Sequence, residues 1–151
     1  MNIEVTPIGY VKNSRKEPID DQWLDVLSEI ELTEDIPDNA LLGLEHFSHV
    51  EVIYYFDRVN PKEIVYANHP RGNKSYPLVG IFAQRKKDRP NQLGLCVGEI
   101  VKVEKRKIHL KYFDAIDGTP VLDLKPVMSE FLPKGDVRQP DWSKDLMKNY
   151  W

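Results

Sequence analysis

The sequence predicts a mainly β fold, a small barrel or sandwich with few helices, and three observations support this. Six short segments alternate apolar and polar residues with the period of two that strands have. These segments are rich in β-branched and aromatic residues and are bounded by Pro, Gly, Asn or Asp. The glycines do not form the Gly-x-Gly-x-x-Gly motif of a doubly wound nucleotide-binding sheet. The predicted strands are residues 3–11, 26–32, 50–56, 78–83, 97–103 and 108–113.

The connections between these strands carry turn and helix signals. Residues 104–107 are predicted to form the turn of a hairpin between the last two strands. Pro37-Asp38-Asn39, followed by a leucine-rich run, predicts one short helix at 37–44. Asp141 is expected to cap a last helix over 142–150, in which Trp142, Leu146 and Tyr150 share a face.

Composition places the chain among globular proteins. With 151 residues, 41% hydrophobic and 30% charged, a single domain over 1–151 is expected, with 126–151 as a C-terminal extension. There is one cysteine, no apolar run long enough to span a membrane and no basic-then-apolar leader, so a soluble cytoplasmic protein is expected. Cys96 lies in an apolar segment and is predicted to be a buried, inert thiol. The histidines have no recognisable ligand spacing, so no metal is expected.

The charge is unevenly distributed along the chain. The net charge is −3, but residues 85–111 carry nine Lys or Arg against three acidic residues. Such a basic strip can neutralise phosphates, which predicts salt-dependent RNA binding. The alternative is a solvated hairpin whose lysines keep an edge strand soluble. The candidate RNA-binding residues are Lys102, Lys105, Arg106 and Lys107.

Two dense sets of polar and turn residues favour a binding site assembled from two loops. The first set runs from Arg85 to Gly94 and Leu95, and the second runs from Asp114 to Pro126. A guanidinium such as that of Arg85 can hold a carboxylate with two hydrogen bonds, although a plain surface arginine is the alternative. An aromatic pair followed by a carboxylate suits a ligand with a flat base, a ribose and a cationic centre. That triplet is Tyr112, Phe113 and Asp114.

Several motifs in these sets are those of a known family. They are Phe82-Ala83-Gln84-Arg85, Arg89-Pro90-Asn91-Gln92-Leu93-Gly94-Leu95 and Asp117-Gly118-Thr119-Pro120-Val121-Leu122-Asp123-Leu124-Lys125-Pro126, with weaker traces at Ile8-Gly9-Tyr10-Val11, Gly43-Leu44-Glu45 and Phe47-Ser48-His49. The chain resembles the TsaA-like (TrmO) family of S-adenosylmethionine-dependent tRNA methyltransferases. The resemblance implies a small closed β-barrel with a few short peripheral helices. It also implies a homodimer with S-adenosylmethionine near the subunit interface, and methylation of the exocyclic nitrogen of threonylcarbamoyl-adenosine beside the tRNA anticodon.

The resemblance also implies which residues bind the cofactor. No base for the nitrogen proton is evident, and Asp57, Asp114 and Asp117 are the candidates. The chain departs from the family where many members have a His, since it has Asp57 and Arg58 there, and residues 20–23 replace the usual N-terminal Pro-Arg-Gln stretch. The implied cofactor-binding residues are Arg85, Leu95, Lys111, Tyr112, Phe113, Asp114, Asp57, Arg58, Arg89 and Asn91.

Two other functions remain open at this level. A methyltransferase that acts on a small metabolite would use the same pocket and leave the basic strip without a role. A non-catalytic RNA- or nucleotide-binding barrel would use the strip for phosphates and the aromatic rings for bases.

Overall fold

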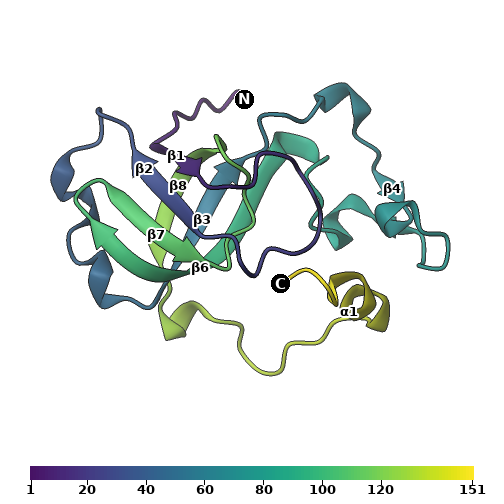
Figure 1. Ribbon diagram of the computed structural model, residues 1–151. Helices are drawn as coiled ribbons and strands as arrows, with labels where there is room; N and C mark the ends of the chain where they lie inside the picture. Colours follow the sequence, from purple (N-terminus) through teal and green to yellow (C-terminus); the bar gives the residue numbers. More distant parts are fainter.

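Six antiparallel strands close a barrel in the computed structural model, which describes residues 1–151 (Figure 1). The strand order around the barrel is β1-β2-β7-β6-β3-β8. This confirms the expected small closed β-barrel. The strands are β1 (Gly9–Lys12), β2 (Ser28–Leu32), β3 (His49–Tyr55), β6 (Leu93–Glu104), β7 (Lys107–Lys111) and β8 (Pro120–Pro126).

The core follows from the period of two in these strands. In β3, for example, Val50, Val52 and Tyr54 point inward and alternate with half-buried residues. Thirteen buried residues from all six strands and their flanking loops fill the barrel, among them Phe113, which is 0% exposed. Because interiors of small barrels are filled by side chains, a ligand has to bind at an end or on the outside.

Three predicted strands differ from the structure. The strand predicted at 97–103 begins four residues earlier, because β6 starts at Leu93. The other two differ more. The first is shorter than predicted, because only Gly9–Lys12 pairs with β2 and β8. The second, residues 78–83, is not a strand of the barrel. β5 (Val79–Gly80) pairs only with β4 (Ala67–Asn68), and Ile81–Ala83 is a 3₁₀ helix. Ile81 is the one buried apolar side chain in this segment, whereas Leu78 and Phe82 are exposed, so the segment has no apolar face to pack on a sheet.

β8 was predicted as part of a polar loop and is instead the strand that closes the barrel. It pairs with β3 from Val50↔Pro126 to Tyr54↔Val121, and with β1 at Gly9↔Val121. Prolines stand at its first and last positions, where a strand tolerates them. Asp123 and Lys125 form a 2.6 Å ion pair, which gives the segment the composition of a surface loop.

The helices are short. The predicted helix at 37–44 is two 3₁₀ helices, Asp38–Leu41 and Leu44–His46, separated at Gly43 with φ 90°. The last helix exists as α1 (Asp141–Met147), but its N-cap is Pro140 and not Asp141. Before α1, residues 131–140 are exposed and lead the chain away from the barrel, and the yellow C-terminal segment then returns beneath the purple N-terminal loop (Figure 1).

The two ends of the barrel differ in what covers them. At one end, where β3 and β7 finish and β6 and β8 begin, residues 112–119 cross from β7 to β8. We call this the loop end. At the other end lie the β6–β7 hairpin turn at Lys105–Arg106 and the two 3₁₀ helices at 38–46, and we call it the hairpin end.

Candidate functional site

The carboxylate of Asp114 is the centre of a hydrogen-bonded cluster at the loop end. The Tyr54 hydroxyl donates to one of its oxygens at 2.8 Å, and the Tyr150 hydroxyl donates to the other at 2.5 Å. Asp114 follows β7, Tyr54 lies in β3, and Tyr150 follows α1. Three segments that are far apart in the sequence therefore meet at one carboxylate.

Local packing fixes Tyr54. Its ring contacts Phe56 and Phe113 edge to face, with centroids 5.3 and 5.6 Å apart. Gly94 stands opposite Tyr54 in β6, and a Cβ at position 94 would overlap the Tyr54 ring. Burial, and then the nearby charge of Asp114, raise the pKa of Tyr54 well above its usual value, so its hydroxyl remains a neutral donor.

Strained backbone gathers around this cluster. Asn91, Gln92 and Tyr112 have φ of 60°, 51° and 54°, in the left-handed region. For a bulky residue such as Tyr112 this is a rare conformation, and such strain tends to collect at functional sites. Gln92 is held by its buried side chain, which donates to the carbonyls of Phe56 and Val59 at 2.9 and 3.1 Å and accepts from the Tyr55 hydroxyl at 2.9 Å.

Cys96 and Arg85 connect the first polar set to this centre. The Cys96 thiol is buried, as the sequence predicts, and donates to the Tyr112 carbonyl at 3.4 Å. Burial raises the pKa of this thiol well above its usual value. The Arg85 guanidinium donates to the Leu95 carbonyl. Its positive charge also opposes the rise that burial causes in the pKa of Cys96 and of Tyr150. The two polar sets therefore converge within a single chain.

Asp117 belongs to a separate cluster that anchors the N-terminal loop. It accepts from the Asn13 backbone at 3.0 Å and forms a 2.7 Å ion pair with Lys16, and these contacts lower the pKa of its carboxyl. The Arg58 guanidinium donates to the carbonyls of Lys16 and Asp117 at 2.9 and 3.3 Å. Asp57 is exposed and has no side-chain partner.

Other sequence-predicted cofactor residues occupy different surroundings. The side chain of Phe113 is fully buried in the core, so only its backbone can reach a ligand. Leu95 is 47% exposed because it points to the outer face of β6. Arg89 donates to the Gln84 carbonyl at 3.0 Å, while Asn91 and Lys111 are exposed at the start of β6 and the end of β7.

The predicted RNA-binding residues lie toward the hairpin end and are mostly paired with acids. Lys102 pairs with Glu104, Arg106 with Asp38 at 2.7 Å, and Lys107 with Glu29 at 2.8 Å. Lys105 has no ion-pair partner. The length of β7, roughly 15 Å at about 3.3 Å per residue, separates this turn from Tyr112.

Residues 20–23, which replace the expected N-terminal motif, pack beside the loop end. Arg15 holds them by donating to the carbonyls of Asp21 and Gln22 at 3.1 and 2.6 Å, and its guanidinium stacks 4.5 Å from the centroid of Trp23. Trp23 is buried. Sequence analysis did not assign Arg15, Tyr54 or Tyr150 to the site. Arg15 lies in a polar loop, Tyr54 lies in an alternating strand, and Tyr150 was expected only on the shared face of the last helix.

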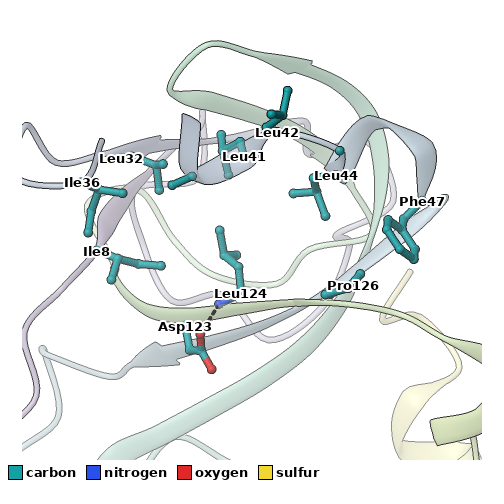
Figure 2. A pocket seen from close by; sticks show the side chains of 12 residues that line it. Ile8, Leu32, Ile36, Leu41, Leu42, Leu44, Phe47, Asp123, Leu124 and Pro126 are labelled. Atoms are coloured by element: carbon teal, nitrogen blue, oxygen red, sulfur yellow. Dashed lines mark hydrogen bonds between the residues drawn. The ribbon is translucent and has the colours of Figure 1, made fainter. Parts of the chain in front are cut away.

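A hollow in the surface at the hairpin end suits an apolar group. It has a volume of about 360 Å³ and nine hydrophobic residues among the twelve that line it. Figure 2 shows Leu124 pointing into it toward Leu41 and Leu44, while the Asp123 carboxylate points away. It lacks the polar groups that a charged nucleoside needs. No group of three His, Cys, Asp or Glu side chains is placed to hold a metal ion, and no helix is long and apolar enough to cross a membrane.

The loop end, by contrast, has the groups for a zwitterionic nucleoside. Asp114 accepts two hydrogen bonds and keeps further acceptor positions, because a carboxylate offers about four. Arg85 supplies a cation for a carboxylate, and the exposed ring of Tyr112 supplies a flat apolar surface. The residues present therefore fit S-adenosylmethionine.

Comparison with known proteins identifies the family. The family profile described as "tRNA-methyltransferase O N-terminal domain" matches residues 10–131. This chain belongs to that family. A relative in Archaeoglobus fulgidus, an S-adenosyl-L-methionine-binding protein, is 34% identical over 128 residues, which are 82% of this chain and 88% of that protein.

Two further relatives are longer than this chain. The human tRNA (adenine(37)-N6)-methyltransferase is 36% identical over 116 residues, which are 75% of this chain and 25% of the human protein. The crystal structure of TrmO from Pseudomonas aeruginosa superposes with a TM-score of 0.73 at 29% identity, covering 91% of this chain and 62% of that one. The chain thus spans a quarter of the human relative and under two thirds of the solved bacterial chain.

Proposed function

We propose that this protein is an S-adenosylmethionine-dependent methyltransferase that methylates the exocyclic nitrogen of an adenosine in tRNA. The observation that carries the proposal is the convergence of Arg85 and Asp114 at one end of a barrel of this family. The names of the relatives support the cofactor, the tRNA substrate and the adenine nitrogen. Threonylcarbamoyl-adenosine beside the anticodon is the specific acceptor that we propose.

In this proposal the cofactor lies across the loop end. The Arg85 guanidinium holds its carboxylate, and Asp114 accepts hydrogens from its ribose hydroxyls or its ammonium group. Tyr112 and Leu95 provide apolar surface for the adenine. Phe113 follows Tyr112 and precedes Asp114 in the chain, and it contributes only its backbone. We assign the rim of this surface to residues at the end of β3, the start of β6 and the end of β7, namely Asp57, Arg58, Arg89, Asn91 and Lys111. Of these, Arg58 also anchors the N-terminal loop.

When bound, the cofactor supplies an activated methyl group on a positively charged sulfur. The task of the protein is to align the acceptor nitrogen with that methyl group and to exclude water. Asp117 is held by Lys16 and Asn13, and Asp114 is held by two tyrosines. Asp57 is the candidate carboxylate whose oxygens are free, so we assign to it the removal of the nitrogen proton.

For the tRNA we propose docking at the loop end. The cations of the first polar set stand beside the cofactor site, and Lys86 has no acidic partner, whereas Lys102, Arg106 and Lys107 are neutralised by acids. Lys105 remains as a possible outer contact for the RNA. Phosphates at the loop end would place a nucleotide next to Asp57.

Calorimetry with S-adenosylmethionine tests the cofactor site. Arg85→Ala is expected to weaken binding by about 1.5–3 kcal/mol, the range for hydrogen bonds to charged groups, or roughly tenfold to 150-fold. Arg138→Ala is the matched control, because Arg138 is exposed and remote in the 131–140 segment. Equal affinity for the Arg85 variant and wild type, at equal stability, would remove Arg85 from the site. Mass spectrometry of nucleosides from treated tRNA then identifies the methylated base.

Two charge reversals locate the RNA surface. Lys86→Glu with Lys87→Glu should depress tRNA binding and reduce the slope of its salt dependence. The reversal of Lys105, Arg106 and Lys107 to Glu should have the smaller effect, since two of these residues already carry acidic partners. The opposite order, measured by filter binding at several salt concentrations, would place the RNA at the hairpin.

We further propose a cytoplasmic homodimer built from single-domain subunits. The outer face of β6 supports the dimer, because Leu93, Leu95 and Val97 form a row of half-exposed apolar side chains that alternates with the inward residues. Leu95 is part of this row, and its backbone carbonyl accepts the hydrogen bond from the Arg85 guanidinium. A dimer through β6 would therefore bring the cofactor site to the subunit boundary.

A further inference from the structure

The C-terminal segment, residues 141–151, packs against the candidate cofactor site although it lies outside the family match at 10–131. We call it the C-terminal strap. In Figure 1 it is the yellow helix α1 and the tail that follows it. It consists of one short helix and four further residues, and the exposed segment before it contributes no anchoring core.

Several independent contacts hold the strap in place. The Tyr76 hydroxyl donates to Asp145 at 2.5 Å, and the Tyr76 ring lies 6.2 Å from that of Trp142. The backbone N–H of Gln22 donates to the Asn149 carbonyl at 3.0 Å, and that of Trp23 donates to the Tyr150 carbonyl at 2.8 Å. The strap is thus attached to both the 70–80 loop and the N-terminal loop, as a fixed wall would be.

The end of the strap reaches the centre of the site. The Tyr150 hydroxyl donates to the Asp114 oxygen that Tyr54 leaves free. Trp151 contacts the rings of Tyr112 and Tyr150 edge to face, with centroids 5.8 and 5.2 Å apart. Tyr112 is the aromatic residue of the site with a left-handed backbone conformation. The strap therefore contacts both the Asp114 carboxylate and the exposed ring of Tyr112.

We propose that the C-terminal strap forms a permanent wall of the S-adenosylmethionine site and that Tyr150 is a positioning residue, which orients Asp114 toward the cofactor. This rests on the proposed function. With one hydrogen bond from Tyr54 and one from Tyr150, the carboxylate is fixed in rotation but keeps about half of its acceptor capacity for the ligand. Because the Asp114 carboxylate is already held in place, it loses no rotational freedom when the cofactor binds.

A double-mutant cycle measured by calorimetry with S-adenosylmethionine tests the role of Tyr150. Tyr150→Phe keeps the ring and removes only the hydroxyl, so we expect about fivefold weaker binding with little change in thermal stability. In an Asp114→Asn background the same change should have no further effect, because Tyr150 acts through that carboxylate. Lys144→Ala, on the exposed side of the strap, is the matched control and should bind like wild type, because Lys144 pairs only with the exposed Asp141.

The outcomes separate this inference from the proposed function. If wild type does not bind S-adenosylmethionine, the proposed function is wrong and the inference falls with it. If wild type binds but Tyr150→Phe binds equally well, only the inference is overturned. The same holds if Tyr150→Phe reduces the affinity by the same factor in the wild-type and Asp114→Asn backgrounds. Tighter binding by Tyr150→Phe would overturn the inference too, because it would show that the strap is a lid that competes with the cofactor.

Discussion

Asp114 and Asp117 lie three residues apart in one loop, and their surroundings give them different tasks. Asp114 accepts from two tyrosine hydroxyls and keeps acceptor capacity for a ligand. Asp117 is engaged by Lys16 and by the Asn13 backbone, and its own N–H donates to the Arg15 carbonyl at 2.8 Å. The Asp117 carboxylate therefore shapes the N-terminal loop, whereas the Asp114 carboxylate is available to a ligand.

Asp117→Asn should lower the free energy of unfolding by about 1 kcal/mol at neutral pH, because it replaces charged hydrogen bonds at a partly exposed site. The pKa of Asp117 is lowered, first by Lys16 and then by the Asn13 backbone. The stabilisation by the Asp117 carboxylate is therefore complete at a pH well above its ordinary pKa of 3.8. This stabilisation is lost as the pH falls through the lower pKa that Asp117 has in the folded protein. Urea unfolding of both proteins from pH 7 to pH 2 measures this.

The difference in stability between wild type and Asp117→Asn should shrink toward zero at the acid end of that series. Asp123→Asn is a suitable control, since its ion pair with Lys125 is exposed on the barrel surface. A difference that stays constant down to pH 2 would mean that the charge of Asp117 is not what stabilises the loop.

At the scale of elements, the pairing of β6 with β3 decides where the site forms. The inward positions of β6 alternate through Gly94, Cys96 and Gly98, which leaves room for the side chains of neighbouring strands. The register places Gly94 opposite Tyr54, and a shift by one residue would turn the outer apolar row inward. The glycine in the first polar set is thus the reason that the Tyr54 hydroxyl can reach Asp114.

Gly94→Ala should destabilise the protein by about 1–3 kcal/mol, the usual range for overpacking a core. The new methyl group would overlap the Tyr54 ring and push its hydroxyl away from Asp114. Chemical unfolding measures the stability, and calorimetry should show weaker S-adenosylmethionine binding. Gly43→Ala is a useful comparison, because nothing lies near its Cβ position and its effect should come from its φ of 90° alone. Wild-type cofactor affinity for Gly94→Ala would contradict the proposed role of Tyr54.

At the scale of the whole molecule, the barrel separates two surfaces. The hairpin end carries the apolar hollow and a network of ion pairs, and the loop end carries the Asp114 carboxylate, Arg85 and the left-handed residues Asn91, Gln92 and Tyr112. Arg85 and Asp114 converge within one chain. A dimer through β6 would thus add a wall to each site without dividing the pair between subunits.

Leu95→Glu should convert the dimer into a monomer, because it buries a charge in the proposed apolar interface. Light scattering measures the mass, and Leu42→Glu, at the opposite end and 83% exposed, should leave it unchanged. Mixed dimers of Arg85→Ala and Asp114→Ala subunits provide a second test. With both residues in one chain, mixing should restore no site, whereas one working site per dimer would mean that the two residues serve it from opposite chains.

The sequence determined much of the architecture of this protein. The alternating segments established the mainly β class and most of the strands, because a half-buried strand needs that pattern. The motifs around Arg85, Arg89-Pro90-Asn91 and Asp117-Gly118 identified the family, which the match at 10–131 bears out. The burial of Cys96 was also predictable, since it lies among apolar residues.

Only the tertiary structure decided the contacts between distant segments. β8 looked like a loop because its charges face solvent, and its role came from pairing with β1 and β3. The acids that neutralise Arg106 and Lys107 lie 68 and 78 residues away in the chain. Tyr54 and Tyr150 meet at Asp114 from 60 and 36 residues away. Period and composition describe neighbours along the chain, whereas the site consists of groups that become neighbours only when the barrel closes.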